Sequence, residues 1–151
     1  MTEVERLVDQ LKRAYEGEAW HGPALKPILA DVTAEQAARR PIPTAHTIWE
    51  LVLHISAWES AVTSRLEGRY TSDPDEGDWP AVAETTEAAW QATLAKLDAT
   101  HHKLRDTIRH FDAERLHKRL AEGKESANYA INGIIQHTLY HAGQIILLKR
   151  A

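Results

Sequence analysis

The stretch INGIIQHTLYHAGQIILLKR, residues 131–150, indicates both a helix and its position in the fold. Apolar residues cover most of the circumference that a helix would have here, which is typical of a helix buried on more than one side. We therefore expect core packing on one side and a subunit interface on the other, most simply that of a homodimer. The apolar positions are Ile131, Ile134, Ile135, Leu139, Ile145, Ile146 and Leu147.

Two histidines, His137 and His141, interrupt this apolar surface four residues apart. Positions i and i+4 of a helix lie one turn apart on the same face, so the two imidazoles can share one metal ion. A buried polar group without a partner costs roughly 1–3 kcal/mol, and a metal ion with hydrogen-bonded ligands would remove that cost. The whole polar stripe consists of Gly133, His137, Tyr140, His141 and Gln144.

A third histidine, His54, lies in a second strongly helical segment. It falls beside Leu51, Ile55 and Trp58 on an apolar stripe, so its side chain should point toward the core or its edge. Three neutral imidazoles leave a metal position open to water or substrate, which is typical of a catalytic rather than a structural site. The alternative is that all three histidines are ordinary buried polar residues, since short histidine motifs also occur without a metal.

Length and composition exclude several classes of protein. A chain of 151 residues fits one domain, residues 1–151, and a net charge of −4 without a basic cluster argues against nucleic-acid binding. The absence of cysteine excludes disulfides, thiolate zinc sites and a cysteine nucleophile, so thiol chemistry would need a thiol from a cosubstrate. The N-terminal segment is charged and amphipathic, and no apolar run could span a membrane, so we expect a soluble cytoplasmic protein.

Apolar residues at helical spacing, few glycines and no alternating strand pattern predict an all-α fold. Four main helices joined by loops indicate a four-helix bundle with short extra helices in the first connection. The capping-box pattern of Thr47 and Glu50 marks the start of the second main helix, and Thr33 marks a short one. We expect main helices at residues 2–16, 47–67, 81–110 and 128–149, and short turns at 24–29, from 33 and at 111–118.

Two glycines, Gly133 and Gly143, lie inside the expected last helix close to the histidines. Glycine in a helix interior costs about 1 kcal/mol relative to alanine, so its presence calls for a reason. One reason is the close approach of another helix, which a side chain would block. The other is space for a ligand beside the histidines.

The other titratable residues have weaker patterns. Asp98, His102, Asp106 and His110 recur every four residues, which fits a metal-binding face but fits better a solvated row of i,i+4 pairs. Three further histidines are expected to be structural or on the surface: His46, His101 and His117.

Two further features have two interpretations each. The loop residues Trp20 and His21 precede a Gly-Pro turn and could cover the mouth of a pocket, but packing of the tryptophan alone would explain them. Glu59 lies shortly after His54 and could orient a ligand or act as a base, although a carboxylate on the helix surface is the simpler interpretation.

The segments TIWELVLHISAWE, residues 47–59, and GIIQHTLYHAGQI, residues 133–145, together resemble the DinB-like family. The resemblance covers nearly the whole chain. It implies an up-down-down-up four-helix bundle, usually dimeric, with a metal site built from one histidine of the second main helix and an H-x-x-x-H pair of the last. These positions correspond to His54, His137 and His141.

The resemblance also implies classes of function, although a fold does not fix a substrate. Some relatives are thiol-dependent transferases or isomerases that use bacillithiol, mycothiol or glutathione. We therefore expect a metal-dependent enzyme that binds zinc or nickel and a small-molecule substrate, such as a thiol S-transferase or a hydrolase. The alternative is a non-catalytic, metal-binding stress-response dimer, in which the metal is structural or sensory.

Overall fold

A computed structural model describes all residues, 1–151, and consists of six α-helices, one 3-10 helix and no strand. None of the helices is both long enough and apolar enough to cross a membrane. The helices are α1 (Glu3–Glu16), α2 (Leu25–Leu29), α3 (Ala34–Ala38), α4 (Ile48–Leu66), α5 (Glu87–Arg109) and α6 (Ala127–Arg150), and the 3-10 helix spans Ala113–Arg115.

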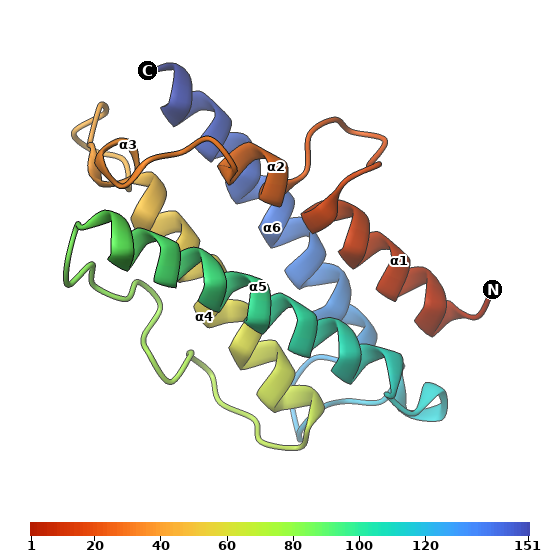
Figure 1. The fold of residues 1–151 in the computed structure, drawn as a ribbon. Coiled ribbons are helices and arrows are strands. Elements are labelled where there is room, and N and C mark those ends of the chain that lie inside the picture. The colour runs from red at the N-terminus through yellow and green to blue at the C-terminus, as the bar shows by residue number, and fades with distance from the viewer.

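The four long helices α1, α4, α5 and α6 form a bundle in which each of them packs against two of the others (Figure 1). Helices α1 and α6 run in one direction and α4 and α5 in the opposite direction, so the predicted up-down-down-up bundle is confirmed. Because α4 and α5 are parallel, the chain must return along the bundle between them, and it does so through residues 67–86. The short helices α2 and α3 lie in the first connection, as predicted.

The start of α4 is fixed by the predicted capping box. The Thr47 hydroxyl accepts a hydrogen bond from the Glu50 amide at 3.1 Å, and the Glu50 carboxylate accepts one from the Thr47 amide at 2.7 Å. These two bonds satisfy amides that would otherwise lack a partner at the helix end. The cap therefore fixes the register of the helix that carries His54.

The predicted start of the third main helix at residue 81 is wrong, because α5 begins at Glu87. Its N-cap is Thr86, whose hydroxyl accepts a hydrogen bond from the Ala89 amide at 3.1 Å. The third position of the helix is alanine rather than an acidic residue, so the sequence lacks the reciprocal half of a capping box. The six residues freed from the helix lengthen the crossover that passes the histidines.

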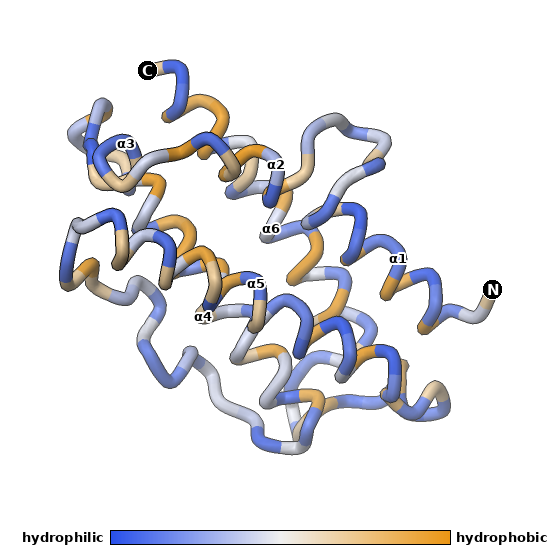
Figure 2. Tube along the Cα trace, viewed as in Figure 1, coloured by the Kyte–Doolittle hydropathy of each residue, from blue (hydrophilic) through white to orange (hydrophobic).

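Apolar residues of the long helices form two buried clusters inside the bundle. Figure 2 shows hydrophobic and hydrophilic positions alternating along these helices. At the end nearest α3, the rings of Trp49 and Trp90 pack at a centroid distance of 5.1 Å. Both indole N–H groups find acceptors: Trp90 donates to the Val32 carbonyl at 2.7 Å and Trp49 to the Thr93 hydroxyl at 3.1 Å. The Trp90 bond therefore ties the first connection to α5, and the Trp49 bond ties α4 to α5.

Two polar residues that we expected on the surface, Glu59 and His101, are fully buried between α4 and α5. His101 Nδ1 lies 3.3 Å from a Glu59 carboxylate oxygen, and the Tyr15 ring stacks on the imidazole at 4.0 Å. His101 follows Leu97 by four residues and precedes Leu104 by three, so it occupies the buried stripe of α5. Burial raises the pKa of the Glu59 carboxyl, although the hydrogen bond from His101 acts in the opposite direction.

Replacement of Glu59 by glutamine tests this burial. A carboxyl with a raised pKa in the folded state binds its proton more tightly there, so folding loses stability as the pH rises above the ordinary value of 4.5. Glu59→Gln should therefore gain stability relative to the parent between pH 4.5 and 8, by an amount on the order of 1–2 kcal/mol. Urea unfolding across this pH range measures the gain, with Glu67→Gln as an exposed control. An identical pH dependence of parent and Glu59→Gln would contradict the assignment.

The two glycines of α6 do not mark a close helix approach. A Cβ atom built at Gly133 or at Gly143 meets nothing within 4 Å, so open space surrounds both positions. Close packing of another helix therefore does not explain why glycine occurs at these positions. Space for a ligand remains as the explanation. Gly133 lines a pocket described below, whereas Gly143 is exposed.

Gly143→Ala should stabilise the protein by about 0.5–1 kcal/mol, since alanine is the better helix former and the added methyl group has room. Chemical unfolding of parent and variant measures the difference. A loss of stability would show that another molecule or segment occupies the space beside Gly143.

Candidate metal centre

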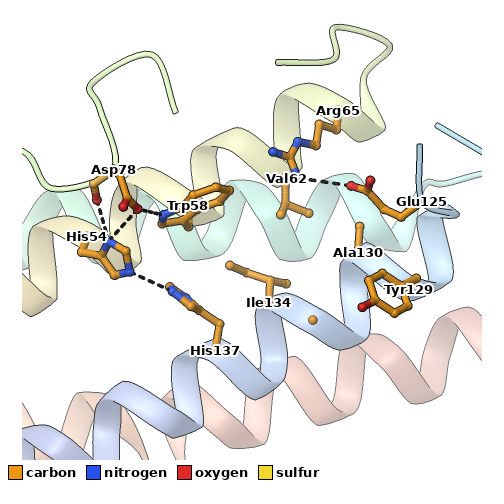
Figure 3. A pocket seen from close by; sticks show the side chains of 11 residues that line it. His54, Trp58, Val62, Arg65, Asp78, Glu125, Tyr129, Ala130, Ile134 and His137 are labelled. Atoms are coloured by element: carbon orange, nitrogen blue, oxygen red, sulfur yellow. Dashed lines mark hydrogen bonds and ion pairs between the residues drawn. The ribbon is translucent and has the colours of Figure 1, made fainter. Parts of the chain in front are cut away.

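The three predicted ligands come together at the contact between α4 and α6. Helix α4 provides His54 and helix α6 provides His137 and His141, and one nitrogen of each lies within 4.8 Å of the others. The Nε2 atom of His137 is 2.9 Å from that of His54 and 3.1 Å from that of His141. Figure 3 shows His54 and His137 pointing toward each other from the two helices. No other cluster of this kind occurs in the chain.

Hydrogen bonds on the outer side of two imidazoles orient them. His54 Nδ1 donates to the Asp78 carbonyl at 2.5 Å, and His141 Nδ1 donates to the Gln144 side-chain oxygen at 2.6 Å. A donor at Nδ1 leaves the Nε2 lone pair free, and in both residues this atom faces the centre. Two imidazoles are thus set to coordinate through Nε2.

The third imidazole shows why a cation fits this donor set. The Nε2 lone pairs of His54 and His141 both point at His137 Nε2, which carries at most one hydrogen and can satisfy only one of them. The other ring nitrogen of His137, Nδ1, is buried without a partner. A metal ion between the three Nε2 atoms would give all of them an electron-pair acceptor, so the residues present fit a bound metal.

The surroundings favour the neutral form of the two α6 imidazoles, His137 and His141. Burial lowers the pKa of His137 to about 4, with a smaller contribution from the neighbouring His141 and His54. Burial also lowers the pKa of His141, partly offset by its bond to Gln144. Metal ions bind the neutral form of imidazole, so these two ligands need no deprotonation at neutral pH before they can coordinate.

The crossover between α4 and α5 forms a wall of the site that the sequence did not predict. The Trp79 ring stacks between two imidazoles, at 3.8 Å from His54 and 3.5 Å from His46. The Trp58 indole N–H donates to the Asp78 carboxylate at 2.7 Å and so holds the same turn on α4. The only signal in the sequence was a tryptophan placed in an otherwise polar loop.

The remaining histidine patterns lie elsewhere. The row from Asp98 to His110 forms solvated pairs along α5, with His102 and His110 donating to the Asp98 and Asp106 carbonyls. His117 is exposed, as expected, and lies 3.0 Å from the Glu3 carboxylate.

The loop residues Trp20 and His21 line a separate groove against Ile135 and Leu139, which face away from the metal-site histidines on α6. The Trp20 side chain is fully exposed, so packing does not explain it, and it does not cover the histidine site. Glu59 is buried against His101 and cannot act as a base there.

The comparison with known families agrees with this architecture. A sequence model of the DinB superfamily matches residues 19–145. The chain belongs to the DinB superfamily. A conserved protein from Enterococcus faecalis has the same fold, with a TM-score of 0.75 over 99% of this chain and 96% of that chain, at 17% sequence identity. No curated protein matches.

Membership in the DinB superfamily agrees with the three-histidine cluster, since proteins of this superfamily often bind metals. Neither the family match nor the structural neighbour assigns an activity to this chain, because a shared fold does not determine a reaction. The role of His54, His137 and His141 as ligands is therefore a prediction from their geometry.

His137→Ala should abolish metal binding without unfolding the bundle, because the side chain is only half-buried and lies beside a pocket. Elemental analysis after dialysis against zinc or nickel compares the variant with the parent. The matched control is His102→Ala, which removes an exposed histidine outside the cluster. Equal metal content in the parent and in His137→Ala would contradict the site.

Proposed function

We propose that this DinB-superfamily protein is a metal-dependent enzyme whose metal is held by His54, His137 and His141 and is open to a substrate. The observation that supports this proposal is the donor set itself. Three imidazoles converge without a fourth protein ligand, and two of them are oriented by Asp78 and Gln144. A structural site would use four protein ligands, whereas an incomplete set beside a pocket leaves a position for substrate.

A bound zinc or nickel ion would lower the pKa of a coordinated water or thiol and so supply a nucleophile at neutral pH. The protein's own residues would position that group. Trp79 and Trp58 cover His54 from two sides and limit access of bulk water to it. The Asp78 carboxylate lines the pocket beside His54 and is placed to accept a hydrogen bond from a group bound there.

The reaction that we favour is transfer of a low-molecular-weight thiol of the bacillithiol type, with hydrolysis as the second candidate. The chain has no cysteine, so the sulfur nucleophile would have to arrive with a cosubstrate. A metal with an open position is suited to bind such a thiol as its thiolate, the reactive form. In hydrolysis, water would occupy the same position.

Turnover by the metal-loaded protein tests the proposal. We expect one of the thiols bacillithiol, mycothiol or glutathione to react with an electrophile at least 100-fold faster with the parent than with His141→Ala, because the variant lacks one ligand. Thiol consumption and adduct formation are measured together, and ester and amide substrates are screened for hydrolysis. The absence of turnover with every thiol and electrophile, and with every ester and amide, would instead favour the non-catalytic, metal-binding dimer.

We also propose a homodimer formed through the outer face of α6. Two large apolar side chains, Tyr140 and Leu147, lie seven residues apart on this face and are each about two-thirds exposed (66% and 67%). Burial of such groups against a second copy would remove apolar surface from water.

Sedimentation should give twice the 17.0 kDa mass of one chain. The double variant Tyr140→Lys with Leu147→Lys should sediment as a monomer, because it would place two ammonium groups in the contact. Trp20→Lys, which changes an exposed tryptophan in the loop after α1 that lines the groove of Ile135 and Leu139, should leave the dimer intact. A parent protein that sediments at 17.0 kDa would contradict the proposal.

A further inference from the structure

A pocket of about 330 Å³ extends from the histidines along the groove between α4 and α6. His54 and His137 form one end, and Arg65 and Glu125 lie at the other end, as Figure 3 shows. A ligand in this pocket could therefore touch the metal position and still reach well beyond it. Its volume is at the lower end of the range for small-molecule sites.

The charges at the far end are already paired within the protein. The Arg65 side chain is 91% buried, and all three of its nitrogens donate: Nε to the Thr71 carbonyl at 3.0 Å, Nη2 to the Ser72 carbonyl at 2.8 Å and Nη1 to Glu125 at 3.2 Å. The second oxygen of Glu125 accepts a hydrogen bond from the Tyr70 hydroxyl at 2.8 Å. Because neither charge is free, this end offers no counter-ion to a charged ligand.

The stretch between the two ends is apolar. Val62 and the Trp58 ring line it from α4, and Ala130 and Ile134 line it from α6 (Figure 3). Gly133 lies between these two α6 residues, and a Cβ atom there would enter open space. Any larger side chain at this position would take volume from the pocket, which gives the glycine a function that offsets its cost in a helix.

We propose that this pocket binds the uncharged, apolar part of the substrate, an alkyl or aryl group, while a polar group of the same molecule binds the metal. The inference rests on the proposed function, because it needs an open metal position at the His54–His137 end. Low-molecular-weight thiols such as glutathione carry several charged groups. In a thiol transfer, the pocket therefore takes the apolar electrophile rather than the thiol.

A series of alkyl hydroxamates tests the inference, since each has the same metal-binding head and only the chain length changes. Calorimetric titration of the zinc-loaded parent should show tighter binding from acetohydroxamate to octanohydroxamate, by up to about fourfold for each methylene buried. Gly133→Leu should keep its zinc and its affinity for acetohydroxamate but lose the gain from the longer chains. The control Ala92→Leu, which adds a leucine on the exposed side of α5 away from the pocket, should retain the gain.

The outcomes separate the two proposals. Binding of acetohydroxamate without any gain from longer chains would overturn the apolar pocket and leave the open metal centre standing. An undiminished gain in Gly133→Leu would also overturn the pocket, because the chains would then bind elsewhere. No binding of any hydroxamate to the zinc-loaded parent would overturn the open metal centre, and the inference that depends on it would fail too.

Discussion

Three imidazoles meet where α4 packs against α6, and the proposed site, its pocket and its chemistry all depend on this convergence. Nitrogen lone pairs that face one another at about 3 Å are unfavourable unless a proton or a cation lies between them. A single proton cannot serve His54, His137 and His141 at once. The fold maintains the arrangement because α4 is fixed at its start by the Thr47–Glu50 cap and α6 is buried along most of its length.

The sequence predicted this part of the molecule because its signals are local. The cap of α4 lies within a four-residue segment, Thr47 to Glu50. A separation of four residues along a helix places His137 beside His141. The inward direction of His54 followed from its apolar neighbours, and the same argument applied to His101 would have placed that residue in the core. The sequence therefore contained the signal for the buried His101–Glu59 pair, which we had instead expected at the surface.

The surroundings of the site could not be predicted in the same way. Asp78 and Trp79 reach His54 because the two parallel helices α4 and α5 need a long return segment, and no residue pattern within that segment reports its path. The start of α5 was misplaced for a related reason, since Thr86 is marked only by its own hydroxyl. Contacts across the bundle thus determine which loop residues lie beside the metal position and line its pocket.

The central claim is that three histidines bind one metal and leave it open. X-ray absorption spectroscopy of the zinc-loaded protein tests it most directly. We predict three imidazole nitrogens at about 2.0–2.1 Å and one further oxygen ligand from solvent, which an added hydroxamate replaces. A first shell with fewer than three imidazoles, or a fourth protein ligand that the hydroxamate does not displace, would contradict the account.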